Sequence, residues 1–178
     1  LRRLVDRMLG PAAVPARVPL NVHEVLERVR RLVQSEAAPG VSVETDYDPS
    51  VPEVLGDREQ LVQVFLNLVR NAVQAITESA HPAGRVVLRT RVRHRVSIGA
   101  RHHRLVLVVE VLDDGPGVPA DLRGQIFLPL VTGRAGGTGL GLSVTHALVS
   151  QHGGHIECDS EPGRTVFTVL LPVNGEGR

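Results

Sequence analysis

The sequence is poor in aromatic residues and contains no lysine. Its 178 residues include no Trp, one Tyr and three Phe, and all 20 basic residues are Arg. Because 42% of the residues are apolar, the chain can form a core, which we expect to consist of Val, Leu and Ala side chains. A chain of this length buries roughly 70% of its unfolded surface when it folds. The composition therefore predicts one ordinary globular domain.

Three further features are scarce or missing. The single cysteine, Cys158, has no partner for an internal disulfide, which is typical of a reducing compartment. No apolar run approaches the ~20 residues of a membrane helix, and no signal peptide is recognisable. A net charge of +1 argues against nucleic-acid binding by bulk charge. We expect a cytoplasmic chain with no membrane segment in this stretch and no nucleic-acid partner.

Hydrophobic periodicity predicts three helices and five strands. Asn21 and Glu24 resemble a capping box before the first apolar helical stripe, and Asp57 is a good N-cap for the second. The third helix is expected over 140–152. Strands are predicted over 41–45, 84–96, 103–112, 154–159 and 165–171, and apolar and polar residues alternate along the first two.

The two ends of the chain differ from this central region. Leu1, Leu4, Val5 and Met8 recur at helical spacing until Gly10-Pro11 stops the helix. We expect the domain boundaries to follow this pattern: 1–10 is the C-terminal end of a longer dimerisation helix, 11–20 a linker, 21–173 the folded domain and 174–178 a loose tail.

Asn67 and Asn71 lie one turn apart on the second predicted helix, at the border of its apolar stripe. Asparagine suits a helix interior poorly unless its side chain is used. Mg²⁺ prefers oxygen ligands such as the amide carbonyl. The pair indicates either a cation site or a helix with two hydrogen-bonded polar residues.

The motif Asp113-Asp114-Gly115-Pro116-Gly117 directly follows a predicted strand. A carboxylate at a strand end can accept a hydrogen bond from an exocyclic amine such as that of adenine. Glycines at 115 and 117 let the backbone approach a flat ring closely. The alternative is a plain β-turn, since Asp, Gly and Pro are common turn residues.

The sequence GGTGLGL at 136–142 leads directly into the third predicted helix. Glycine-rich backbone at a helix N-terminus binds anions, and Arg134 supplies a cation for a terminal phosphate. The motif lacks the lysine and the spacing of a P-loop. A flexible loop is the alternative. The three motifs together indicate a site for a magnesium nucleotide.

In this order the asparagine motif, the DxGxG motif, the segment Ile126-Phe127-Leu128-Pro129 and GTGLGL resemble the catalytic domains of sensor histidine kinases. These domains belong to the ATPase superfamily of gyrase, Hsp90 and MutL. PLVTGRAGGTGLGLSV and LRRLVDRMLGP are most similar to the NtrB-type nitrogen-regulation kinases. The resemblance covers residues 20–172. It implies an α/β fold, a two-layer Bergerat-type sandwich with a mixed sheet of about five strands covered on one face by about three helices.

The resemblance implies ATP and Mg²⁺ as cofactors. Asn71, helped by Asn67, would bind Mg²⁺. Asp113 would hold the adenine amino group, with Gly115 and Gly117 beside the ring.

The same resemblance places the phosphates and the lid over them. The phosphates would lie against the backbone of Gly139, Leu140 and Gly141, near Thr138 and Arg134, and Phe127 would anchor the lid. Asn67, Asn71 and Arg134 are therefore the expected catalytic residues. Leu130 replaces a second lid phenylalanine, and Asp114 stands where asparagine is common.

Two departures refine the predicted activity. Asn67 stands where the gyrase, Hsp90 and MutL relatives carry a glutamate general base, and an amide cannot activate water. This favours phosphoryl transfer over hydrolysis. None of the eight histidines has the setting of the family's phosphoacceptor, and they are not expected to form a metal site. The γ-phosphate would therefore go to a histidine on the dimerisation domain of the same homodimeric protein.

The partners beyond that domain follow from the resemblance. It implies a response regulator of the NtrC type and a PII signal protein as modulator. Two alternatives stay open: a nucleotide-sensing module without transfer activity, and an ATP-hydrolysing clamp. The Arg-rich stretch 89–104 is either a solvated strand face or a docking surface.

Overall fold

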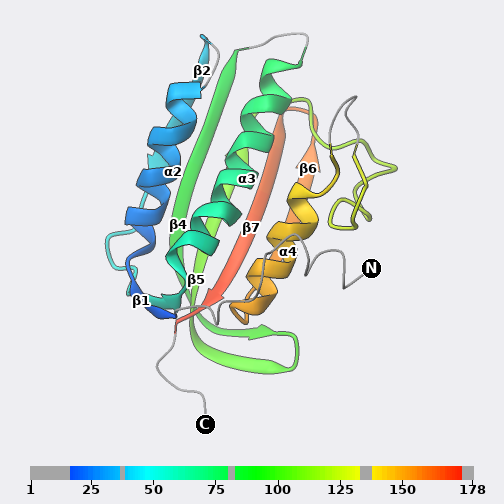
Figure 1. Cartoon of the computed structure of the whole chain (residues 1–178). Coiled ribbons are helices and arrows are strands. Elements are labelled where there is room, and N and C mark those ends of the chain that lie inside the picture. Colours follow the sequence, from blue (N-terminus) through cyan, green and yellow to red (C-terminus); the bar gives the residue numbers. More distant parts are fainter. Residues whose placement is uncertain (1–16, 37–38, 80–82, 133–137, 174–178) are drawn as a thin grey trace.

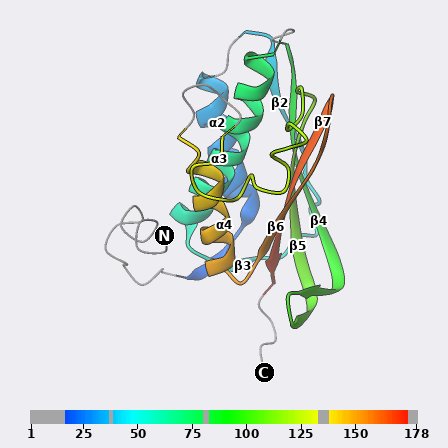
Figure 2. The ribbon, with the colours of Figure 1, turned by 90° about the vertical axis from the view of Figure 1, so that its right-hand side faces the viewer.

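The computed structural model describes residues 17–36, 39–79, 83–132 and 138–173. Three helices pack on one face of a five-stranded sheet, so the predicted two-layer α/β fold is confirmed (Figures 1 and 2). The strand order is β2-β4-β5-β7-β6. Only the β2–β4 pair is parallel, and the other three pairs are antiparallel, which makes the sheet mixed.

The helices are α2 (Val22–Glu36), α3 (Arg58–Thr77) and α4 (Gly141–Gln151). The N-cap predicted for α3 is confirmed, because the Asp57 side chain accepts a hydrogen bond from the Gln60 amide at 3.1 Å. The capping box predicted for α2 is only half right. Asn21 accepts from the His23 amide at 2.9 Å, whereas the Glu24 carboxylate pairs with Arg58 across the helix interface at 2.8 Å.

The five strands of the main sheet are β2 (Val41–Asp46), β4 (Gly84–Ile98), β5 (Arg101–Asp113), β6 (His155–Glu161) and β7 (Arg164–Pro172). All five were predicted, although β4 and β5 extend further towards their shared turn than expected. Their register runs from Val86 opposite Asp113 to Ile98 opposite Arg101.

A second, two-stranded sheet was not predicted. β1 (Val18–Leu20) pairs with β3 (Val54–Gly56) in antiparallel fashion. Residues 18–20 therefore form a strand within the stretch expected to be a linker. Strands of three residues are too short to show a period in the sequence.

The core lies between the sheet and the three helices. It consists mainly of Val and Leu, as the composition predicted, with Phe65 as its largest fully buried side chain. The predicted contribution of Ala is small, since Ala72 is the one alanine among the described core residues. Apolar residues of α3 lie at the centre of this layer, since α3 packs between α2 and α4 and over β4 and β5. The motifs at the upper ends of α3 and β5 are thereby fixed next to the start of α4.

Candidate functional site

A cavity of about 790 Å³ lies between α3, the loop after β5 and the start of α4. Its volume is in the range of small-molecule sites. The structure brings together six of the predicted site residues in its lining: Asn71, Asp113, Gly117, Thr138, Gly139 and Gly141. Three stretches that are far apart in the sequence therefore meet at one cavity.

The other predicted residues have different positions. Asn67, Gly115, Phe127 and Leu140 lie next to the cavity but do not line it. Arg134 lies outside the described residues, as do residues 1–10 and the tail 174–178.

Asn67 connects α3 to the first turn of α4. Its Nδ2 donates to the Gly141 carbonyl at 3.2 Å and to the Thr145 hydroxyl at 3.3 Å. Its carbonyl oxygen accepts no hydrogen bond from any described residue. Asn71, one turn further along α3, is partly buried in the cavity wall. The two asparagines thus present amide groups at the junction of the two helices.

Asp113 is held by the turn that follows it. The side chain is buried, and its Oδ1 accepts a hydrogen bond from the Gly115 amide at 3.0 Å. Gly117 has a φ of 83°, and a Cβ there would lie 2.8 Å from the Glu161 carbonyl oxygen. The Gly115 carbonyl accepts from the Gly163 amide at 2.9 Å. The loop is therefore a tight turn fixed against the β6–β7 turn, with a carboxylate in the cavity wall.

The backbone of Gly139, just before α4, contacts the backbone of Leu130. The Leu130 amide donates to the Gly139 carbonyl at 2.9 Å. Gly139 has a φ of 64°, and a Cβ at this position would lie 2.6 Å from the Leu130 carbonyl carbon. Leu130 itself has a φ of 65°, which is rare for a residue with a side chain. Only glycine fits at 139.

Phe127 packs next to the cavity, against α4 and β7. Its ring lies 5.8 Å from that of His146 on α4 and makes an edge-on contact, at 6.4 Å, with Phe167 on β7. Phe167 lines the cavity directly. The ring of Phe127 therefore joins the segment after β5 to both layers of the domain.

Several lining residues were not singled out from the sequence. Gln74 and Glu78 share the helix face of Asn71, and their spacing along α3 would have found them. Thr165 and Phe167 come from β7, opposite the end of β5. The irregular stretch 118–126 also lines the cavity, with Arg123 among its residues, and it carries no periodic signal.

His152 fixes the opposite end of α4, and its role was also missed. The residue is only 5% exposed. Nε2 accepts a hydrogen bond from the Asp57 amide at 3.1 Å, and Nδ1 donates to the Leu148 carbonyl at 2.8 Å. Burial lowers the pKa of His152, which keeps the ring neutral. The Arg17 guanidinium also donates to the Gln151 carbonyl, so the segment before β1 contacts this helix end.

Cys158, on β6, is a partly buried free cysteine. Burial, reinforced by the negative charge of Asp113, raises its pKa to about 12. Because the thiolate is the reactive species, this cysteine is a poor nucleophile.

Two negative findings apply to the described ranges. No helix in them is both long and apolar enough to cross a membrane. They also contain no group of three or more His, Cys, Asp or Glu side chains arranged to hold a metal ion.

Residues 56–175 match the family model described as histidine kinase-, DNA gyrase B- and HSP90-like ATPase. The chain therefore belongs to this ATPase family. It is 45% identical over 173 residues to the sensory histidine kinase/phosphatase NtrB of Vibrio alginolyticus and 46% identical to that of Escherichia coli O157:H7. Each alignment covers 97% of this chain but only 49% of the relative, so the chain spans about half the length of these proteins.

A solved structure supports the same relationship. Full-length ShkA in complex with AMPPNP has a TM-score of 0.74 and is 27% identical. The match covers 99% of this chain and 35% of that one.

Proposed function

We propose that the chain is the catalytic domain of an NtrB-type sensor histidine kinase. It would bind ATP and transfer the γ-phosphate to a histidine on the dimerisation domain of the same protein. The observation that carries this proposal is the meeting of Asn71, Asp113 and the glycine-rich start of α4 at one cavity. The names of its relatives point to the same activity.

The donors at the α3–α4 junction fit a magnesium ion. Amide oxygens are hard ligands, and the carbonyl oxygen of Asn67 has no partner among the described residues. Asn71, helped by Asn67, would hold the ion. When bound, Mg²⁺ would neutralise charge on the phosphates. The side chains themselves would orient the nucleotide and keep the two helices in register.

The adenine and phosphate ends of the cavity differ in chemistry. Asp113 would accept a hydrogen bond from the adenine amino group, because the Gly115 amide already fixes its orientation. Gly115 and Gly117 lie in the turn beside it. At the other end, the N-terminus of α4 has no side-chain cap, so its amides are available to an anion. The backbone of Gly139, Leu140 and Gly141 would surround the phosphates, near Thr138 and Arg134.

Transfer rather than hydrolysis follows from residue 67. An amide cannot take a proton from water, so the domain has no general base at this position. Positioning and charge neutralisation would supply most of the catalysis, as in other phosphoryl transfers.

The wider assignments belong to the whole protein. We propose that it is a cytoplasmic homodimer in which Phe127 anchors the nucleotide lid. Its response regulator would be of the NtrC type, and a PII signal protein would modulate it. These proposals rest on similarity to NtrB proteins over half their length.

Calorimetric titration with ATP, with and without magnesium, tests the nucleotide site. Asn71→Ala should lose the magnesium-dependent part of the affinity, by about tenfold or more, since a charge-assisted contact contributes roughly 1.5–3 kcal/mol. Gln63→Ala, an exposed change on the same helix, is the matched control and should bind as the parent does. Equal magnesium dependence in both variants would refute the metal role of Asn71.

Transfer is tested by mixing the chain with a separate NtrB-type dimerisation domain and γ-labelled ATP. We expect label on the histidine of that domain and little free phosphate. Nucleotide binding without label would identify a sensing module. Steady phosphate release by the chain alone would identify a hydrolytic clamp.

A further inference from the structure

The β4–β5 ribbon continues beyond the rest of the sheet. The pairing of β2 with β4 ends at Arg89, and that of β7 with β5 ends at Val106. Residues 93–104, which we call the basic hairpin, therefore pair only within the β4–β5 ribbon and project from the lower end of the domain (Figures 1 and 2). No other described element needs this extension for its own hydrogen bonds.

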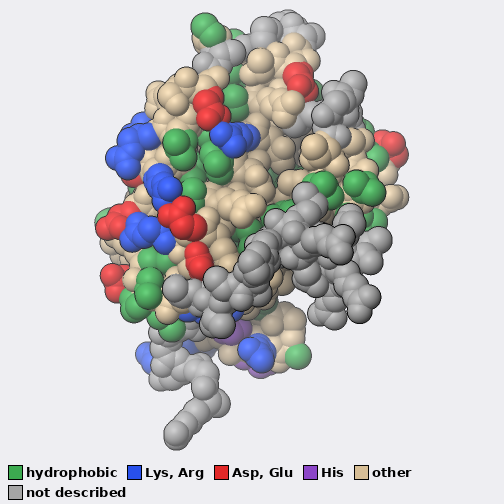
Figure 3. Space-filling model, viewed as in Figure 1, with side chains coloured by type: hydrophobic (Ala, Val, Ile, Leu, Met, Phe, Trp, Pro, Cys, Tyr) green, Lys and Arg blue, Asp and Glu red, His purple; other side chains and the backbone are tan. Residues whose placement is uncertain are grey.

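The basic hairpin carries charge of one sign. It contains four Arg and three His and no acidic residue: Arg93, His94, Arg95, Arg101, His102, His103 and Arg104. All of these except His103 are exposed. Blue and purple side chains, with no red among them, mark the visible part of this projection in Figure 3.

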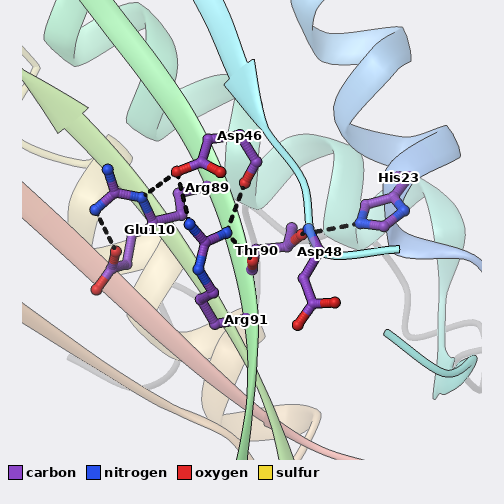
Figure 4. A network of polar contacts seen from close by, with 7 residues as sticks. All are labelled: His23, Asp46, Asp48, Arg89, Thr90, Arg91 and Glu110. Carbon is purple, nitrogen blue, oxygen red and sulfur yellow. Dashed lines mark hydrogen bonds and ion pairs between the residues drawn. The ribbon is translucent and has the colours of Figure 1, made fainter. Parts of the chain in front are cut away.

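Arginines nearer the start of β4 are arranged differently. Arg89 and Arg91 both contact Asp46 at 2.7 Å, and Arg89 also lies 3.5 Å from Glu110 (Figure 4). By contrast, Arg93, Arg95 and Arg101 form no ion pair with any described acidic side chain. Arg89 and Arg91 belong to a structural network, whereas Arg93, Arg95 and Arg101 have no ion-pair partner among the described residues.

The arrangement of arginines in the basic hairpin is unfavourable for the stability of the fold. The register on both sides of Arg95 sets it across from Arg104, and like charges in such a position repel each other. Arg95 also has a φ of 56°, which is unfavourable for a residue with a side chain. The positive charge of Arg93, Arg95 and Arg101 therefore has no stabilising ion pair among the described residues.

The hairpin is nonetheless a packed element. Val96 and Ile98 pack against a small apolar cluster of Val106, Val108 and Leu170, separate from the main core. Their packing fixes the backbone that carries the guanidinium groups. A preorganised array of this kind loses less conformational entropy on binding than a flexible basic tail would.

The hairpin chemistry favours a protein partner. It has no Phe, Tyr or Trp, the large aromatic side chains on which the bases of single-stranded nucleic acids stack. It also has no exposed large apolar side chain for insertion into a lipid surface. The planar guanidinium group of arginine forms bidentate hydrogen bonds with carboxylates. We propose that the basic hairpin is a docking surface for an acidic face of a partner protein, recognised through Asp and Glu carboxylates.

This surface is independent of the proposed nucleotide site. Arg101 and Asp113 mark opposite ends of the 13-residue strand β5. At ~3.4 Å per residue they are about 40 Å apart. A partner on the hairpin would leave the cavity open, so both can be occupied at once.

The test uses the whole chain and a fluorescent glutamate-rich peptide as probe, followed by anisotropy at about 100 mM salt, where screening extends over ~10 Å. The triple variant Arg93→Ser, Arg95→Ser, Arg101→Ser should bind the peptide at least about tenfold more weakly, because its charge contacts are lost. The matched control, Arg31→Ser, Arg70→Ser, Arg85→Ser, removes the same charge from exposed positions elsewhere and should change affinity less than about twofold.

Thermal melting of each variant verifies that it is folded, and a DNA duplex and anionic vesicles are tested in parallel. The proposal is overturned if the parent does not bind the peptide, or if the control loses as much affinity as the hairpin variant. Tighter hairpin-dependent binding to the duplex or to the vesicles overturns it as well, and would assign the surface to nucleic acid or to lipid.

Discussion

The two ends of α4 differ in how they are held. At the C-terminal end, the buried ring of His152 joins the helix to the start of α3, and Arg17 contacts the Gln151 carbonyl. At the N-terminal end, the helix begins in glycine-rich backbone without a side-chain cap. The C-terminal end is therefore fixed through a buried ring, while the N-terminal end, which Asn67 joins to α3, borders the cavity. Substitutions at the fixed end should alter stability, and those at the cavity end should alter ligand binding.

The largest expected effect is that of His152→Ala. The change leaves the Asp57 amide without its acceptor and a space beside Gly56, where the ring is packed. We expect a loss of about 2–3 kcal/mol in the free energy of unfolding, since an unsatisfied buried group costs about 1–3 kcal/mol and cavity formation adds to it. For a domain of this size, this corresponds to a fall of roughly 5–10 °C in Tm.

Differential scanning calorimetry measures this change, and His155→Ala is the control because that nearby histidine is exposed. ATP affinity of the folded His152→Ala protein should stay close to that of the parent. A large loss of affinity with unchanged Tm would contradict the proposed division between the two ends.

A smaller effect, on ATP affinity rather than on stability, is expected from Gly139→Ala. The added Cβ would meet the Leu130 carbonyl carbon. In addition, the φ of 64° at residue 139 is strained for alanine. Realignment of the phosphate loop should weaken ATP binding by about tenfold, since such strain is of order 1–3 kcal/mol. Titration calorimetry measures it. Gly124→Ala, where a Cβ meets nothing within 4 Å, should behave as the parent does.

The smallest effect is a pH dependence of stability. Burial lowers the pKa of His152 below its ordinary value of 6.5, so the unfolded chain takes up a proton before the folded one does. The stabilisation is complete above pH 6.5 and is lost as pH falls through the folded pKa. Urea titrations between pH 5 and pH 7.5, about the range over which histidine titrates, should show this decline.

In His152→Gln the decline should be shallower. It should not vanish, because burial also lowers the pKa of His23. An identical slope in the parent and in His152→Gln would show that this histidine does not contribute.

The sequence predicted the features that depend on local pattern. The N-cap at Asp57, the apolar stripes of α2 and α3 and the alternation along β4 are all readable within a few residues. The cavity was predicted in the same way, because the motifs that surround it are short and chemically distinctive. The roles of the individual site residues remain predictions.

Other features depend on partners that are distant in the sequence. His152 meets an amide 95 residues away, and Glu24 pairs with a residue 34 positions further on. No local sequence pattern predicts either contact. β1 and β3 were missed because three residues cannot establish alternation.

The high pKa of Cys158 has a practical consequence. Cys158 is the only cysteine in the chain. Because its thiol stays protonated at neutral pH, thiol reagents should react with it only slowly. A single cysteine introduced at the exposed Leu128 would then take up a spin label or fluorophore selectively, with no need to remove the native one. Spectroscopy on such a labelled chain would follow the segment after Phe127 as nucleotide is added.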